Sequence, residues 1–185
     1  MRENKLFPWW GGYFLSCSLR KVYQNPYRIL AEYIKPSMQV ADIGSGMGYF
    51  SIPMAHMVGD KGKVVAVDLQ QKMLQGLERK AKKVGNISQL ETQICSKNSL
   101  RLEKWNQRFE FALAFAIAHE VPDRERFFAE IADSMKKGAK LLVAEPIGHV
   151  SEECFEESVR IAKARGLKVI GKPTIKLSRS VLLEK

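Results

Sequence analysis

The chain has 185 residues, of which 45% are hydrophobic and 27% are charged, and its 30 Lys and Arg against 20 Asp and Glu give a net charge of +10. These values predict one domain with a buried core and exclude a collagen, a coiled coil or a wholly disordered chain. A membrane-spanning protein is excluded as well, because no apolar run reaches the roughly 18 residues that a spanning helix needs.

Residues 1–24 precede the first predicted helix and form an aromatic arm. The apolar segment 6–15 faintly resembles a signal peptide, but Pro and Gly interrupt it and no small-residue cleavage site follows. We therefore expect the arm to fold onto the rest of the chain, a domain over residues 25–185. There Trp9 and Trp10 would either cover the substrate as a lid or pack against the core.

Strands and helices alternate along the remainder of the chain, as hydrophobic periodicity and turn residues indicate. Strands are predicted at 40–43, 63–68, 87–94, 109–117, 141–146, 167–170 and 179–184, and helices at 25–34, 49–58, 70–84, 122–137 and 151–165. This alternation indicates a doubly wound, Rossmann-like α/β fold with a seven-stranded, mainly parallel sheet and helices on both faces. Because no helix separates the last two strands, we expect them to pair as an antiparallel hairpin at the sheet edge.

A glycine-rich bend follows the first strand and reads Gly44-Ser45-Gly46-Met47-Gly48. Glycines let the backbone turn tightly and let a ligand approach it with no Cβ in the way. The G-x-G-x-G spacing differs from that of dinucleotide-binding and phosphate-binding loops, so it favours a ligand without phosphates. Taken alone, the bend would also fit an ordinary turn between a strand and a helix.

An acidic residue, Asp68, ends the second strand, 24 residues after Gly44. The carboxyl ends of neighbouring parallel strands meet at one edge of a sheet, so this carboxylate would lie near the glycine-rich bend. There it can accept hydrogen bonds from both hydroxyls of a ribose. The alternative is that Asp68 only caps the helix that follows.

Four motifs follow one another along the chain in the order of the predicted strands. They are residues 40–48 (VADIGSGMG), 64–68 (VVAVD), 109–115 (FEFALAF) followed by 119–123 (HEVPD), and 140–146 (KLLVAEP). Together they resemble the class I S-adenosylmethionine (SAM)-dependent methyltransferases over residues 25–185, in the variety of the small quinone-biosynthesis-type enzymes. The resemblance implies the Rossmann-like fold, its final antiparallel strand pair and SAM as the cofactor.

The resemblance also implies which residues bind the cofactor. The methionine part of SAM would lie against Gly44, Gly46 and Gly48, and Asp42 would reach its amino group directly or through water. Asp68 would hold the ribose. The complete predicted set of cofactor-binding residues is Asp42, Gly44, Ser45, Gly46, Gly48, Asp68, Leu69, Cys95, Ser96 and Ala116.

The adenine would pack on Leu69. Many members of the family contact the adenine amine with an Asp after the third strand, and here that place reads Gln93-Ile94-Cys95-Ser96. That contact is therefore left open, or it passes to a backbone group or to Ser96.

Residues 116–120, after the fourth strand, would flank the sulfonium and the substrate. Within them, His119 and Glu120 are the predicted catalytic pair, because an ionisable pair at the end of a strand can act as a general base for a substrate proton. The alternative is that Glu120 caps the helix starting at Pro122, while His119 fills the wall of the site.

The spacing of the cysteines and histidines indicates the cellular compartment of the protein and whether it binds a metal. The chain has three cysteines, an odd number, with no C-x-x-C pair among Cys17, Cys95 and Cys154. This pattern is expected of reduced thiols in a cytoplasmic protein. No spacing of His and Cys indicates zinc, so no metal site is predicted.

The positive charge is dispersed, with 13 basic against 7 acidic residues in 1–92 and 17 against 13 in 93–185. Cations at the end of a helix complement its dipole and face water. The densest cluster lies at such an end and comprises Arg79, Lys80, Lys82 and Lys83. No nucleic-acid-binding motif accompanies it, so the charge permits an anionic partner without requiring one.

The function predicted is direct, in-line methyl transfer from SAM to a small-molecule acceptor, because little of the chain remains for a large recognition domain. One alternative is an RNA methyltransferase, motivated by the net charge. Enzymes that methylate nucleic-acid amino groups carry an N/D-P-P-Y/F signature where this chain reads Ala114-Phe115-Ala116-Ile117, which counts against that subclass. The other alternative is a protein that binds SAM without turnover. The sequence carries no signal for the acceptor atom or the oligomeric state.

Overall fold

The computed structural model describes residues 23–85 and 88–185. Its strands are β1 (Gln39–Ile43), β2 (Lys63–Asp68), β3 (Leu90–Ile94), β4 (Phe109–Phe115), β5 (Met135–Pro146), β6 (Lys168–Gly171) and β7 (Ser178–Glu184). Its helices are α3 (Pro26–Leu30), α4 (Ser51–Val58), α5 (Gln71–Val84), α6 (Arg124–Ser134) and α7 (Glu152–Ala164), with a 3-10 turn, η2 (Glu103–Trp105).

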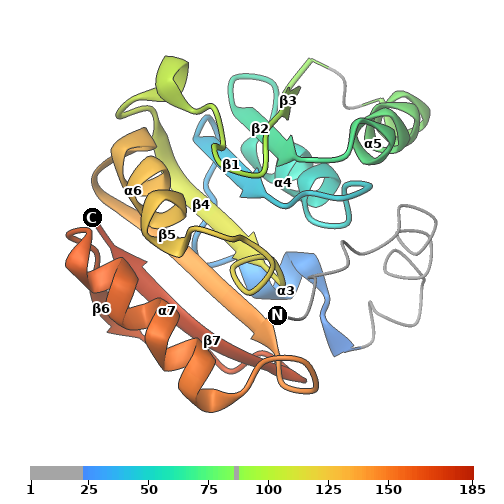
Figure 1. The fold of residues 1–185 in the computed structure, drawn as a ribbon. Coiled ribbons are helices and arrows are strands. Elements are labelled where there is room, and N and C mark those ends of the chain that lie inside the picture. Colours follow the sequence, from blue (N-terminus) through green and yellow to red (C-terminus); the bar gives the residue numbers. More distant parts are fainter. Residues whose placement is uncertain (1–22, 86–87) are drawn as a thin grey trace.

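The seven strands of this part of the chain form one sheet in the order β3-β2-β1-β4-β5-β7-β6 (Figure 1). β7 lies between β5 and β6 and is antiparallel to both, whereas the other neighbouring strands are parallel. The predicted α/β fold is therefore confirmed, and so is the antiparallel pairing of the last two strands. β6 forms the edge of the sheet on that side.

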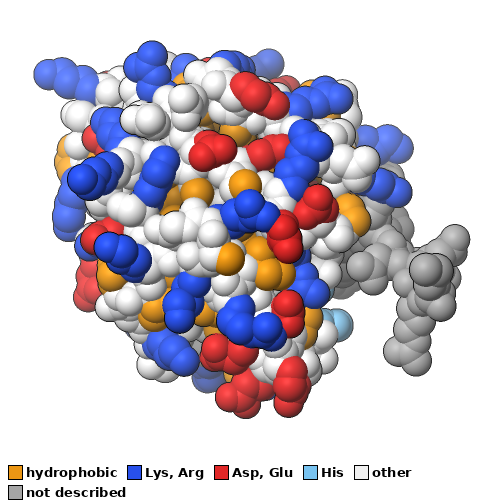
Figure 2. Space-filling view, turned by 60° about the vertical axis from the view of Figure 1, so that its left-hand side comes forward, with side chains coloured by type: hydrophobic (Ala, Val, Ile, Leu, Met, Phe, Trp, Pro, Cys, Tyr) orange, Lys and Arg blue, Asp and Glu red, His pale blue; other side chains and the backbone are white. Residues whose placement is uncertain are grey.

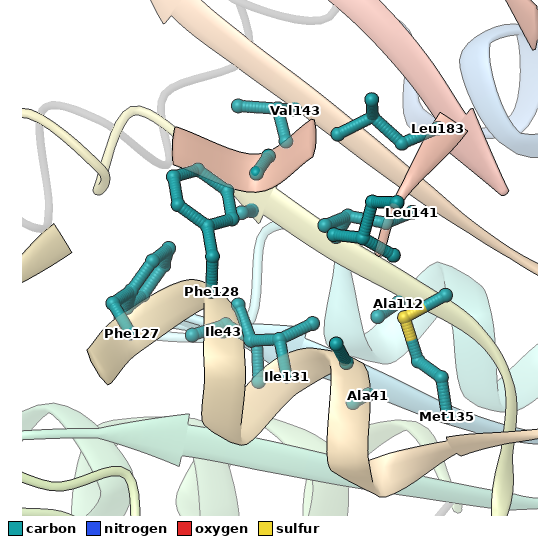
Figure 3. Packing of buried hydrophobic residues seen from close by; sticks show 14 of the residues in the cluster. Ala41, Ile43, Ala112, Phe127, Phe128, Ile131, Met135, Leu141, Val143 and Leu183 are labelled. Carbon is teal, nitrogen blue, oxygen red and sulfur yellow. The ribbon is translucent and has the colours of Figure 1, made fainter. Parts of the chain in front are cut away.

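Side chains of the strands alternate between the two faces of the sheet, as the pleat of a strand requires. In β1, Val40 packs in the cluster with α3 and α4, whereas Ala41 and Ile43 pack in the cluster with α6 and α7. Figure 3 shows the second cluster, in which Phe128 and Ile131 of α6 lie against the sheet. Since both faces of the central strands are covered, a ligand can approach the sheet only at the strand ends.

Several predicted boundaries differ from the structure, and the largest difference is at the start of β5. The helix predicted over 122–137 ends at Ser134, and β5 begins directly with Met135. The Met135 side chain is fully buried, and the residue pairs with Phe109 at the start of β4. Pairing and burial in the sheet outweigh the helical spacing of the sequence at this point. Gly138 lies within β5 with a φ of +77°.

Parts of two sequence expectations fall outside the described residues. Trp9 and Trp10 of the expected aromatic arm lie there, and so does Cys17. Cys95 and Cys154 are free thiols. Between residues 23 and 85 and from 88 onward, no helix combines the length and the apolar character needed to cross a membrane.

Candidate functional site

A cavity of about 590 Å³ lies at the carboxyl ends of the central parallel strands. Its wall comes from the segments that follow β1, β2, β3, β4 and β5, together with α6. The order of the strands reverses between β1 and β4, and open α/β sheets bind ligands at such a point. The volume is in the range of small-molecule sites.

The glycine-rich bend between β1 and α4 forms one side of this cavity. Gly44 and Gly46 line it, and both have a positive φ, +76° and +53°. A Cβ on Gly44 would come within 2.8 Å of Ile117 Cγ1, so the bend approaches the segment after β4 closely. A Cβ on Gly46 would meet no heavy atom within 4 Å. The backbone at Gly46 is therefore open to a ligand.

The carboxylate of Asp68 ties the bend to the end of β2. Its Oδ2 accepts a hydrogen bond from the Gly46 amide and its Oδ1 accepts one from the Gln70 amide, both at 2.8 Å. Burial raises the pKa of Asp68, and these backbone hydrogen bonds oppose the rise. A carboxylate has about four acceptor positions, so these two bonds leave room for a ligand's hydroxyl groups. Asp68 and the adjoining Leu69 both line the cavity.

Three predicted cofactor residues lie outside the cavity wall. The buried Asp42 accepts a hydrogen bond from the Ser51 hydroxyl at 2.5 Å, and Ser45 is buried too. Gly48 packs so tightly against Leu77 of α5 that an added Cβ would overlap its side chain. The contacts of these residues with a cofactor stay predictions, whereas the packing of Gly48 is a sufficient reason for its being glycine.

The segment after β3 closes a second side, and it contains the predicted Cys95 and Ser96. Burial raises the pKa of the Cys95 thiol to about 11, with a smaller contribution from the Asp68 charge, so the thiol is neutral near pH 7. Glu130 of α6 accepts hydrogen bonds from the Ser99 hydroxyl and the Leu100 amide, and it holds this segment against the helix. These contacts were not predictable from the sequence because they join segments 30 residues apart.

The segment after β4 brings the predicted catalytic residues to the third side. Ala116, His119 and Glu120 all line the cavity, and Ala116 has a positive φ of +58°. The imidazole Nδ1 of His119 forms a hydrogen bond with Oε2 of Glu145, near the end of β5. The Nε2 of the same ring lies 4.0 Å from Oε1 of Glu120.

Glu145 is the residue of this group that the sequence analysis missed. Its side chain is only 1% exposed, and its second oxygen, Oε1, accepts a hydrogen bond from the Ala118 amide at 2.8 Å. A single acidic residue in the otherwise apolar run 141–146 was the available signal, because a buried carboxylate requires partners.

The environment shifts the protonation of both predicted catalytic residues. The hydrogen bond to Glu145 raises the pKa of His119, while burial of the imidazole opposes the rise. Burial raises the pKa of Glu120. The alternative in which Glu120 caps the following helix is wrong, because Asp123 is the N-cap of α6 and accepts a hydrogen bond from the Arg126 amide at 2.9 Å.

The first described residues also reach the cavity. Gln24 lines it, and its side-chain amide donates to the Lys176 carbonyl and to the Ser178 hydroxyl, both at 3.1 Å. The Tyr49 hydroxyl donates to the Gln24 carbonyl at 2.9 Å. The end of the predicted N-terminal arm is thereby fixed at the edge of the cavity.

Comparison with known protein families and curated sequences gives matches over most of the chain. A family model described as a methyltransferase domain matches residues 34–175. The ubiquinone/menaquinone biosynthesis C-methyltransferase of Shewanella sp. strain ANA-3 is 30% identical over 123 residues, which are 64% of this chain and 47% of that protein. The chain thus spans about half the length of this relative.

Solved structures show the same fold. A SAM-dependent methyltransferase from Aquifex aeolicus superposes with a TM-score of 0.85 at 23% identity, covering 96% of this chain and 98% of the other. A SAM-dependent methyltransferase from Methanosarcina mazei superposes with a TM-score of 0.68 at 18% identity, covering 86% and 97%. These likenesses support the fold.

Proposed function

The chain belongs to the methyltransferase-domain family, and from this premise we propose that it transfers a methyl group from SAM to a small-molecule acceptor by direct, in-line displacement. The membership confirms the resemblance described from the sequence. The observation that carries the proposal is that the glycine-rich bend, Asp68 and His119 all line the same cavity.

The residues of the cavity fit SAM. The bend is open at Gly46, where an added Cβ would meet no heavy atom within 4 Å, and the Asp68 carboxylate keeps acceptor positions for the two ribose hydroxyls. Leu69 offers an apolar surface for the adenine, beside the neutral Cys95 thiol. Ala116 would lie near the methyl-bearing sulfur. Bound SAM supplies a methyl group that the positive sulfonium has already activated.

The task of the protein is then chiefly to position the reactants. Bond formation needs the acceptor atom, the methyl carbon and the sulfur in line. Holding reactants in such an arrangement can lower the activation free energy by about 7–11 kcal/mol. The bend and Asp68 would fix one reactant, and the wall near His119 would receive the other. His119 and Glu120 line that wall as the proposed catalytic pair.

We take the acceptor to be a small molecule because the cavity is of small-molecule size and its wall is largely apolar. The name of the Shewanella relative, a C-methyltransferase of ubiquinone/menaquinone biosynthesis, supports such an acceptor. The N-terminal arm would cover the acceptor, since Gln24 lies at the cavity edge. Free thiols at Cys95 and Cys154 support a cytoplasmic location.

RNA is the second candidate acceptor, and the net charge of +10 is the observation that favours it. On the face shown in Figure 2, however, Lys and Arg side chains are scattered among acidic and uncharged ones. A nucleic-acid site more often shows basic side chains gathered on one face. The charge distribution therefore favours the small-molecule acceptor.

Radiolabelled methyl transfer distinguishes these candidates. The purified chain is incubated with methyl-labelled SAM and cell extract, and the extract is separated into RNA, protein and small-molecule fractions. We expect label in the small-molecule fraction. Label confined to RNA would show that the acceptor is RNA and not the small molecule that we propose. SAM binding in calorimetry without any transfer would favour a binding protein.

A further inference from the structure

We propose that Glu145 holds His119 in the tautomer that leaves Nε2 unprotonated, and that this Nε2 removes a proton from the acceptor as the methyl group is transferred. The inference rests on the proposed function and extends it to the acceptor class, namely a molecule whose attacking group carries a proton near pH 7. Glu145 is a positioning residue, because it acts through His119.

The geometry of Glu145 fixes which imidazole nitrogen carries the proton. A buried carboxylate accepts hydrogen bonds and donates none, so its contact with His119 requires a proton on Nδ1. The other carboxylate oxygen is engaged by the Ala118 amide, so the carboxylate is held from both sides. Glu145 is only 1% exposed, so bulk water has little access to its carboxylate. With Nδ1 protonated, neutral His119 has a lone pair on Nε2.

The position of Nε2 fits a base. The two ring nitrogens are separated by Cε1 and point in different directions, and Nε2 lies 4.0 Å from Oε1 of Glu120 while Nδ1 contacts Glu145. His119 and Glu120 both line the cavity, and the His119 side chain is 24% exposed. We therefore place the methyl acceptor against this part of the cavity wall, within reach of Nε2.

The surrounding charges favour the protonated imidazole that the reaction produces. Glu145 of β5 and the adjacent Glu120 raise the pKa of His119, while Arg124 of α6 and burial lower it. The net direction is upward, so a proton arriving at Nε2 is stabilised by charges already in place. A carboxylate that accepts from the far nitrogen of a catalytic histidine stabilises the imidazolium in this way.

The proton and electron balance of the step is complete without a further reactant. The attacking atom of the acceptor forms a bond to the methyl carbon, and the bond from that carbon to sulfur breaks, with its electron pair moving to sulfur. The acceptor proton moves to Nε2 of His119. The imidazolium later returns that proton to water, which restores the base.

Nuclear magnetic resonance tests the tautomer without any methyl donor. The chain has three histidines, His56, His119 and His149, so long-range ¹H–¹⁵N spectra of histidine-labelled protein are readily assigned with a His119→Gln variant. We expect neutral His119 to carry its proton on Nδ1 and to titrate above the ordinary value of about 6.5. A proton on Nε2 in the wild-type protein overturns the proposal, and so does a pKa at or below the ordinary value.

The variant Glu145→Gln should reverse the tautomer. The glutamine carbonyl must stay toward the Ala118 amide, because an NH₂ group there would face another donor. The NH₂ group then donates to Nδ1 of His119, and the imidazole proton moves to Nε2. Unchanged His56 and His149 signals verify folding. A His119 tautomer that is the same in folded wild type and variant contradicts the inference.

Once the labelling experiment has identified the acceptor, steady-state kinetics distinguish a role of Glu145 in positioning His119 from a role in stabilising the fold. We expect Glu145→Gln to lower kcat by about 10²–10⁴-fold, the range of general-base contributions, with little change in KM or SAM affinity. The rise of kcat with pH should follow the His119 titration in wild type and lose that dependence in the variant. Glu157→Gln, the same change at an exposed ion pair with Arg160 on α7, is the matched control and should match wild type.

The outcomes distinguish the two proposals. If wild-type protein fails to bind SAM, the proposed function fails, whatever the histidine tautomer. If SAM binds and methyl transfer occurs at an equal rate in wild type and Glu145→Gln, the function stands and the role of Glu145 is refuted.

Discussion

The two sides of the cavity are built in different ways. On the β1–β2 side, the Asp68 carboxylate and two backbone amides shape a surface within about 25 residues of sequence, and glycine conformations do most of the shaping. On the β4–β5 side, a buried Glu145 and a half-buried His119 meet from segments 26 residues apart. The first side depends on backbone geometry, and the second depends on the protonation of side chains.

The contrast implies that substitutions on the two sides should have different signatures. A Cβ added on the glycine side changes space and backbone strain, so it should alter stability or ligand affinity at every pH. A carboxylate neutralised on the other side changes charge without changing volume, so its effect should depend on pH.

Gly48→Ala should destabilise the fold by about 2–4 kcal/mol, because the new Cβ overlaps Leu77 in the core and alanine is strained at a φ of +78°. Gly46→Ala is the matched control, since its Cβ meets no atom within 4 Å and only the strain, about 1 kcal/mol, remains. Urea denaturation measures the free energy of unfolding of both variants and of wild type. Equal losses in the two variants would show that packing against α5 is not what requires a glycine at position 48.

Asp68→Ala should weaken SAM binding by about 1–3 kcal/mol, because two ribose hydroxyls lose their acceptor. Isothermal titration calorimetry measures the dissociation constant, which should rise by about 5- to 150-fold. Asp133→Ala, which removes an exposed carboxylate on α6, is the control and should leave the affinity unchanged. An Asp68→Ala protein with wild-type affinity would remove Asp68 from the cofactor site.

The smallest expected effect is the pH dependence of stability on the β4–β5 side. The folded pKa of His119 is raised, chiefly by Glu145, so its contribution to stability is complete below the unfolded value of about 6.5 and is lost as pH rises through the folded pKa. The difference in the free energy of unfolding between wild type and Glu145→Gln should therefore shrink as pH rises from the unfolded to the folded pKa of His119. Urea denaturation of both proteins at a series of pH values measures this difference. A difference that grows toward high pH would contradict the prediction.

The glycine side was largely readable from the sequence. Positive φ at Gly44 and Gly46 and the placement of Asp68 at a strand end follow from local residue types and strand order. The boundary at Met135 was not readable, because its pairing with Phe109 joins distant segments and overrides local helical spacing.

The sequence by itself determined the alternating elements, the antiparallel final strands and the family, because these follow from periodicity and from motifs of a few residues. Only the tertiary structure decided that Gly48 packs on Leu77 and that Glu145 meets His119. The physical reason is that hydrogen bonds and packing between distant side chains depend on strand register and burial, which exist only once the sheet has formed.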